Sequence, residues 1–367
     1  MAQRHPDPTD TPAATATGDA LADYLRAQAT EFLRALRLHR ETGGHTGGGP
    51  ARARAGTGGH AGGTEECVDA ARALRRSARR ISASLHTFRP LLDPDWSEEM
   101  RPELAWLSGT LGLEHAYEAR LERLLLALHR LSGAAVLPGR AAAPATVGGA
   151  GPDRSAPAAD RGALTVGVAK AGALLERQLT LARTRAHSTA LQALGSARFH
   201  AVADKVALLA SEVPLAPAGR TTALHTLAAA AEERLTDAVT ALPLITAGHP
   251  YNAEALVHGL SPEPSPHPQD GPWHQVRLLL RLHRYAHEVL RGAGTAAPVD
   301  VRLLSAGQAL NRHRDASEAA AAAAQAARTP RITPATAYAL GVLHADQRHE
   351  VEAARFAFQQ TWQHPTP

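Results

Sequence analysis

The sequence predicts an all-α protein with two helical halves. Alanine and leucine dominate the 367 residues, whereas β-branched residues are scarce and Phe, Trp and Tyr together make up 4%. That composition favours helices and disfavours a large sheet. Apolar residues recur with the helical period along most of the chain, and no convincing strand alternation is present. A hydrophobic content of 44% over this length is enough for a real core.

Successive helices are expected wherever this period is unbroken. The first begins at Asp19, an N-cap candidate; the second is stopped by Pro90, and the third is ended by Gly112. The expected helical segments are 19–40, 65–88, 96–111, 113–131, 164–194, 197–211, 221–242, 273–291, 301–328 and 333–363.

Low-complexity stretches divide the chain. The Gly-rich stretch 42–64 has the composition of a flexible loop, 134–162 is an Ala/Pro/Gly linker, and 260–272 holds five prolines. We therefore expect a disordered N-terminus at 1–18 and a helical domain over 19–363. Its first half is 19–133 and its second half is 163–363.

Composition also bounds the class of protein. A single cysteine, Cys67, excludes an internal disulfide framework and is expected to be an inert buried thiol. No apolar run reaches the length of a membrane span, and residues 1–19 lack the apolar segment of a secretory signal. A cytoplasmic, soluble protein is expected.

Net charge alone indicates no polyanion binder, because Lys and Arg number 39 against 35 Asp and Glu. Only Lys170 and Lys205 are lysines. Codon bias of a GC-rich genome accounts for the abundance of arginine, so only the placement of the arginines is informative.

The segment 65–88 has an almost purely cationic polar face. At 100° per residue, five arginines fall within an arc of roughly 140°: Arg72, Arg75, Arg76, Arg79 and Arg80. The opposite side carries Leu74, Ala78, Ile81, Leu85 and Phe88. Like charges one turn apart destabilise a helix, so a group outside this helix should offset the repulsion.

The segment 273–291 repeats this design. Its basic stripe consists of His274, Arg277, Arg281 and Arg284. Leu278, Leu282, Tyr285 and Val289 are expected to face a core beside it. Arginine forks match phosphate oxygens bidentately, and several in a row suit a chain of phosphates. The alternative is a solvated arginine face, or arginines that pair with acids on other helices.

Four strings resemble the CHAD family (conserved histidine α-helical domain). ALRRSARRISASLHTFRPLLDPDW, Ala73 to Trp96, is similar to its first signature, H-x-x-R-V-x-x-R-R-x-R followed by T-F-R-P-L-L. HQVRLLLRLHRY, from His274, is similar to the second copy, H-x-V-R-K-x-x-K-R-x-R-Y. LNRHRDA, from Leu310, resembles the L-G-x-x-x-D helix, and YALGVLHADQRHE, from Tyr338, resembles the C-terminal segment. The likeness spans about residues 19 to 363.

The resemblance implies two antiparallel helical bundles related by a pseudo-twofold axis, with basic helices lining a central groove that binds inorganic polyphosphate. No nucleophile elbow, pair of catalytic carboxylates or cofactor fingerprint is recognisable in the sequence, so no catalysis and no cofactor are expected. No E-x-E-x-K strand motif of a triphosphate tunnel domain precedes residue 19, so a stand-alone module is expected. The expected polyphosphate-binding residues are Arg72, Arg75, Arg76, Arg79, Arg80, His274, Arg277, Arg281, Arg284 and His313.

The motifs depart from the family pattern at several positions. Arg72 replaces the first histidine, and Leu278 and Leu282 replace two basic residues of the second copy. His115 and Ala116 stand where the first half of the family has an Arg-Asp pair. We therefore expect the second stripe to be the weaker.

Other patterns are assigned ordinary roles. His283 and His287 have a spacing that could hold zinc, but H-E-x-x-H is absent and no third ligand is predictable, so surface histidines and no metal are expected. His344 is expected to pack or hydrogen-bond between helices. The Gly-rich stretch lacks the G-K-[ST] ending of a P-loop.

The first hypothesis is therefore a non-enzymatic polyphosphate-binding protein, with polyphosphate granules as a candidate location. One alternative is a regulatory or accessory domain of a phosphate-handling hydrolase, disfavoured because no carboxylate cluster is evident near either basic helix. The other is a nucleic-acid binder, disfavoured because aromatic residues for base stacking are not interleaved with the arginines.

Overall fold

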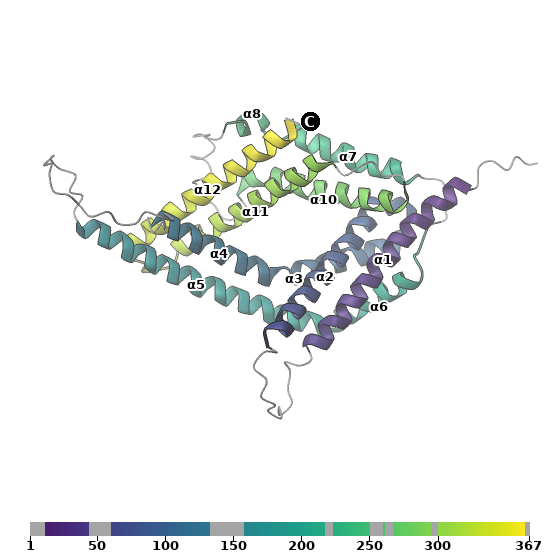
Figure 1. Ribbon diagram of the computed structural model, residues 1–367, viewed down its shortest axis with the longest axis horizontal. Helices are drawn as coiled ribbons and strands as arrows, with labels where there is room; N and C mark the ends of the chain where they lie inside the picture. Colours follow the sequence, from purple (N-terminus) through teal and green to yellow (C-terminus); the bar gives the residue numbers. More distant parts are fainter. Residues whose placement is uncertain are drawn as a thin grey trace, which may run out of the picture. The chain divides into compact units, whose positions relative to one another are not determined.

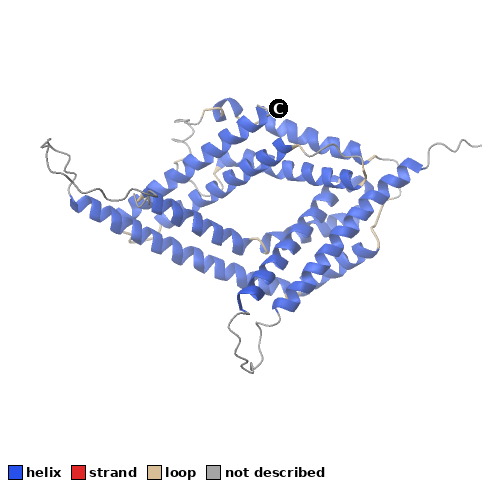
Figure 2. Ribbon diagram, viewed as in Figure 1, coloured by secondary structure: helices blue, strands red, loops and turns tan. Residues whose placement is uncertain are grey.

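The computed structural model describes residues 12–43, 60–132, 158–216, 223–249, 260, 267–294 and 300–363. Within these ranges the chain is helical and forms no strand (Figure 2). An isolated antiparallel bridge pairs Leu92 with Leu215. The predicted all-α fold class is confirmed.

Figure 1 labels most of the helices, coloured along the chain from purple to yellow. Their bounds are α1 Pro12–Gly43, α2 His60–Thr87, η2 Arg89–Leu91, α3 Pro94–Thr110, α4 Leu113–Leu131, α5 Ala158–Leu194, α6 Ala197–Ser211, α7 Leu224–Thr240, α8 Leu244–Ala247, η4 Pro268–Asp270, α10 Gly271–Gly292, α11 Val301–Ala327 and α12 Pro334–Gln363.

Several helices extend beyond the expected bounds. Helix α1 begins at Pro12, so Asp19 is not its N-cap, and residues 12–18 are helical instead of disordered. Helix α2 begins at His60, inside the Gly-rich stretch, and α5 begins at Ala158. Adding a residue to an existing helix costs far less than nucleating one, so weak helix formers continue a helix that packing already holds. The remainders of the two linkers, 44–59 and 134–157, lie outside the described residues.

Side-chain caps fix the starts of several helices, of which α3 and α6 are examples. The Asp93 carboxylate accepts a hydrogen bond from the Trp96 backbone N–H at 2.8 Å, and Pro94 occupies the first turn of α3. The Ser196 hydroxyl accepts one from the Phe199 N–H at 3.1 Å and caps α6. Each cap satisfies an N–H that the helix itself leaves without an acceptor.

The chain forms two compact units, each built from three separate stretches. Unit 1 comprises Met1–Glu114, Arg185–Ala241 and Gln275–Leu303. Unit 2 comprises His115–Thr184, Leu242–His274 and Leu304–Pro367. The sequential halves 19–133 and 163–363, and the pseudo-twofold relation between bundles, stay predictions.

Unit 1 has a core of large apolar side chains from six helices. Leu25 of α1, Ile81 of α2, Leu104 of α3, Phe199 of α6 and Val289 of α10 are all fully buried in it, and α7 adds the buried Leu224. The apolar face predicted for the first basic helix is confirmed, because Leu74, Ala78, Ile81, Leu85 and Phe88 are each 0–1% exposed.

One hydrophobic cluster of unit 2 combines leucines with alanines. Leu128 of α4, Leu175 of α5 and Leu340 of α12 pack with alanines of α11, among them Ala319 and Ala323 at 0% exposure. Alanine faces let helix backbones approach closely. Among the described residues, no helix is both long and apolar enough to span a bilayer.

Candidate polyanion site

The two basic helices pack directly against each other in unit 1. Ala83 of α2 forms a small buried cluster with Leu282 and Tyr285 of α10. Leu282 and Tyr285 were predicted to be buried and are confirmed at 8% and 6% exposure. This apolar contact holds the arginine-bearing parts of both helices near one another.

Arg79 lies where the charges of the two helices converge. Burial, followed by the positive charges of Arg75, Arg281 and Arg277, lowers the pKa of Arg79 to about 9, against the opposing effect of Tyr285. All four guanidinium-bearing residues are half-buried. We call Arg75, Arg79, Arg277 and Arg281 the arginine cluster. Guanidinium groups are cationic at neutral pH, so the folded chain concentrates positive charge in partly desolvated surroundings.

The turn between α3 and α4 positions Arg75. Its Nε donates a hydrogen bond to the Ser108 carbonyl oxygen at 3.1 Å. A Cβ atom added to Gly112 would collide with the Arg75 guanidinium. The glycine therefore leaves space for this side chain to lie along the turn.

Arg80, the next residue, has a different environment. Its Nε donates to Glu288 Oε2 at 2.7 Å, and the Tyr24 hydroxyl donates to the same oxygen at 3.2 Å. Burial would lower the pKa of Arg80, but hydrogen bonding to Glu288 and its charge outweigh burial and raise it. Burial and the nearby Glu288 charge raise the pKa of Tyr24. Arg80 is thus a member of an internal ion pair.

The remaining arginines of the two stripes are exposed. Arg72 is in an ion pair with Asp69, one turn earlier on α2, at 3.1 Å. Arg76 is exposed, and the exposed Arg284 guanidinium carbon lies 5.5 Å from the Tyr285 ring centroid. These residues can contact a ligand without any rearrangement of the core.

Unit 2 contains a second group of arginines, buried around Asp270. This carboxylate accepts hydrogen bonds from Arg348 at 2.7 and 3.2 Å and from Arg355 at 2.7 Å. Arg355 also donates to Glu352 at 2.8 Å. All four residues are 2–5% exposed. Together with His313 they form what we call the Asp270 network.

His313 corrects a sequence-based expectation. It is 1% exposed, so it cannot contact a polymer in this conformation, and we remove it from the expected binding residues. Its Nε2 accepts a hydrogen bond from Arg355 Nε at 3.3 Å and lies 3.5 Å from Asp270 Oδ1. Burial lowers the pKa of His313 to about 4 despite the opposing effect of Asp270. Burial would raise the pKa of Asp270, but His313 and Arg348 hold it well below its usual range.

His274 adjoins the network. Its Nε2 lies 3.4 Å from the Ser317 hydroxyl, and its ring meets the His313 ring edge-on at a centroid distance of 5.4 Å. It is half-buried and belongs to unit 2, whereas the rest of its stripe belongs to unit 1. Its expected contact with polyphosphate stays a prediction.

Three further expectations have clear outcomes. Leu278 is 45% exposed and does not face the core; Val276 and Leu280, at 1% and 4%, are buried instead. His283 is not a surface histidine, since it is 3% exposed. Burial and the charge of His287 lower its pKa, against the effects of Glu232 and Asp300. The helix–helix role of His344 is confirmed, because its Nδ1 contacts the Ala320 carbonyl oxygen at 2.9 Å.

Sequence reasoning missed the carboxylates that organise these groups. Asp270 lies in a Pro-rich stretch whose composition predicts a break between helices. Glu288 lies in a helix whose dominant sequence pattern is its basic stripe. The signal that could have found the network is Arg348, Glu352 and Arg355 on one helix, four and three residues apart, which places three charges on a single face. The side chain of Cys67 lies outside what the structure describes.

Comparison with known proteins identifies the family. The family model described as CHAD domain matches residues 59–324, more than half of the chain. A solved structure described as "PptA from Streptomyces chartreusis" is 66% identical, with 95% of this chain and 99% of that chain covered and a TM-score of 0.72. A search of curated proteins found no match. The chain therefore belongs to the CHAD domain family.

Proposed function

We propose that this protein binds inorganic polyphosphate through the arginine cluster and its exposed neighbours, without catalysing a reaction. The CHAD domain is associated with polyphosphate binding. The observation that carries the proposal is the half-buried Arg79, whose strongest charged neighbours are other guanidinium groups. A polyanion would replace this repulsion with charge-assisted hydrogen bonds.

Position and chemistry support a chain of phosphates in particular. Arg76 and Arg284 extend the cluster to exposed positions on α2 and α10, so successive phosphates could be held along both helices. Arginine forks bind phosphate oxygens bidentately. Arg80 supports the arrangement from inside, because its ion pair with Glu288 ties α2 to α10. Arg72 and His274 stay candidate contacts.

Fluorescence anisotropy with labelled long-chain polyphosphate over a salt series tests the proposal. We expect affinity to fall steeply with salt, because each phosphate contact releases a condensed counterion. Replacing both Arg76 and Arg79 by Glu reverses two charges and should weaken binding by about 100-fold or more, since each charge-assisted hydrogen bond is worth roughly 1.5–3 kcal/mol. The Arg281→Glu, Arg284→Glu pair should have a similar but smaller effect.

The matched control reverses Arg34 and Arg37 to Glu on α1, an equal change in net charge at exposed positions of the same unit. Unchanged affinity in the α2 variant, or equal losses in the variant and the control, would refute a localised site. Competition against RNA and DNA of equal charge tests the nucleic-acid alternative. Release of orthophosphate from polyphosphate with Mg²⁺ would refute the non-enzymatic part.

A further inference from the structure

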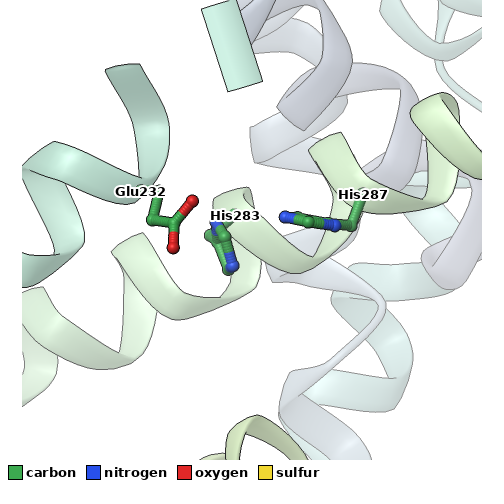
Figure 3. Close-up of side chains that lie close together, drawn as sticks. All are labelled: Glu232, His283 and His287. Atoms are coloured by element: carbon green, nitrogen blue, oxygen red, sulfur yellow. The ribbon is translucent and has the colours of Figure 1, made fainter. Parts of the chain in front are cut away.

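A group of three metal-ligating side chains lies on α7 and α10, apart from the residues proposed to bind polyphosphate. Glu232 of α7 and His283 and His287 of α10 each offer one donor atom, and these atoms all lie within 4.8 Å of one another. In Figure 3 the Glu232 carboxylate points towards His283 from one side and the His287 ring from the other. We call these three residues the His–Glu cluster.

Helical spacing explains why the two histidines meet. Residues four apart lie one above the other on the same face of a helix. The His283 and His287 rings are 4.5 Å apart between centroids, at an interplanar angle of 64°. Glu232 comes from a different helix, so the third donor could not be read from the spacing within 273–291.

An unsatisfied buried atom gives independent evidence for a ligand. His283 is 3% exposed, and its Nδ1 has no hydrogen-bond partner among the described residues. A buried polar atom without a partner costs free energy and is uncommon in folded proteins. A ligand that accepts electron density from the ring would remove that cost.

We propose that Glu232, His283 and His287 bind a divalent transition-metal ion of the Zn²⁺ type and thereby join α7 to α10. Two imidazoles and one carboxylate form a donor set that zinc accepts, with its fourth position left for water.

The rearrangement needed is small. Zn–N and Zn–O bonds of about 2.0–2.2 Å place tetrahedral donors about 3.4 Å apart. Glu232 is exposed, and His287 is half-buried, so side-chain rotation can bring their donors inward while His283 stays in place. The backbones of α7 and α10 need not move far.

The His–Glu cluster and the arginine cluster lie on different faces of α10. At 100° per residue, the midpoint of His283 and His287 lies roughly 110° around α10 from the middle of the stripe formed by Arg277, Arg281 and Arg284. A variant of one group therefore leaves the other intact, and the metal proposal stands or falls independently of polyphosphate binding.

The test uses the untagged full chain, stripped with a chelator and titrated with Zn²⁺ alone by calorimetry. We expect one tight site per chain and a rise in the thermal unfolding midpoint, because a ligand that binds only the folded state stabilises it. Glu232→Gln and His287→Ala should each weaken that site at least tenfold and reduce the midpoint shift. Co²⁺ in place of Zn²⁺ should give the visible absorption of a tetrahedral site, and the same two variants should lose it.

The controls are Glu233→Gln, the exposed neighbour on α7, and His225→Ala, an exposed histidine on the same helix. Both should bind Zn²⁺ as the unaltered chain does. Buried His283 is left unchanged, so poor folding cannot imitate loss of a ligand. The proposal is overturned if the unaltered chain binds no Zn²⁺ tightly. It is equally overturned if all four variants retain the site, or if the controls lose it as the cluster variants do.

Discussion

The arginine cluster of unit 1 and the Asp270 network of unit 2 both withdraw guanidinium groups from water, but the charges next to those groups differ in sign. In the network, Arg348 and Arg355 are almost fully buried, and the Asp270 carboxylate lies within hydrogen-bonding distance of both. In the cluster, burial and three other guanidinium groups lower the pKa of Arg79. Strongly shifted pKa values are typical of functional sites, so the cluster is where the proposed polyanion contact is best tested.

Two adjacent residues show the same contrast within one helix turn. Hydrogen bonding to Glu288 raises the pKa of Arg80, whereas Arg79 is shifted in the opposite direction. The two residues are of the same type and are adjacent in the sequence. The difference lies in which neighbours each side chain meets: Arg80 is paired with Glu288, whereas Arg79 lies among other guanidinium groups.

The largest expected effect comes from breaking the network. Asp270→Asn keeps the side-chain shape but leaves Arg348 and Arg355 without their shared countercharge. Removing one partner of a buried ion pair costs roughly 3–5 kcal/mol, so the free energy of unfolding should fall by about that amount. Urea unfolding measures it. Asp69→Asn, at an exposed ion pair, is the control and should change stability by less than about 0.5 kcal/mol. Equal effects of both substitutions would contradict the structural role of Asp270.

A pH dependence of stability should report on the same network. The pKa of His313 is about 4 in the folded chain, below its ordinary value near 6.5. Between these pH values the unfolded chain binds more protons than the folded chain. The contribution of His313 to the free energy of unfolding is therefore fully present above pH 6.5 and is lost as the pH is lowered towards 4. The loss from this group is up to about 3 kcal/mol at 1.36 kcal/mol per pKa unit.

Comparison with His313→Gln isolates that contribution. Asp270, Arg355 and His274 face the ring and remain in the variant. Burial also lowers the pKa values of His283 and His86, so some slope should persist. Urea unfolding of both proteins at pH 7, 5.5 and 4.5 should give a shallower slope for the variant. Parallel slopes would mean that His313 titrates normally.

Substituting the adjacent arginines should shift stability in opposite directions. Arg79→Met removes a half-buried charge from among like charges, so we expect the free energy of unfolding to rise by about 1 kcal/mol. Arg80→Met leaves Glu288 without its cation, so we expect a fall of about 2 kcal/mol. Polyphosphate anisotropy should show about tenfold weaker binding for Arg79→Met, a stability gain at the expense of function. Shifts of the same sign in both variants would undo the distinction between these residues.

Much of the helical framework was predictable, because it depends on local patterns. Segments 113–131 and 197–211 have the bounds expected from the sequence, and the apolar face of 65–88 is buried as expected. Capping residues and the helical period act over a few residues and can be read directly. Helix α8 was missed because a four-residue helix has no period to detect.

Tertiary partners were much less predictable. The arginines were correctly placed on two stripes, but no local signal separates Arg79 from Arg80. The burial of His313 and the third donor of the His–Glu cluster, Glu232, depend on which distant helices pack together. Leu278 shows the same limit, since it lies on the apolar side of its helix yet no neighbour covers it enough to bury it.

The smallest expected effect tests how finely the arginine cluster is positioned. A Cβ at Gly112 would collide with the Arg75 guanidinium, whereas a Cβ at Gly109 would meet nothing within 4 Å. Because the obstructing group is the end of a flexible side chain, Gly112→Ala should change the free energy of unfolding by less than about 1 kcal/mol. The displaced Arg75 should lose its hydrogen bond to Ser108, one that holds the guanidinium beside Arg79. We expect about threefold weaker polyphosphate binding, the effect of one modest hydrogen bond. Gly109→Ala is the control and should bind as the unaltered chain does. If Gly112→Ala also binds normally, the cluster acts through its total charge and not through the placement of Arg75.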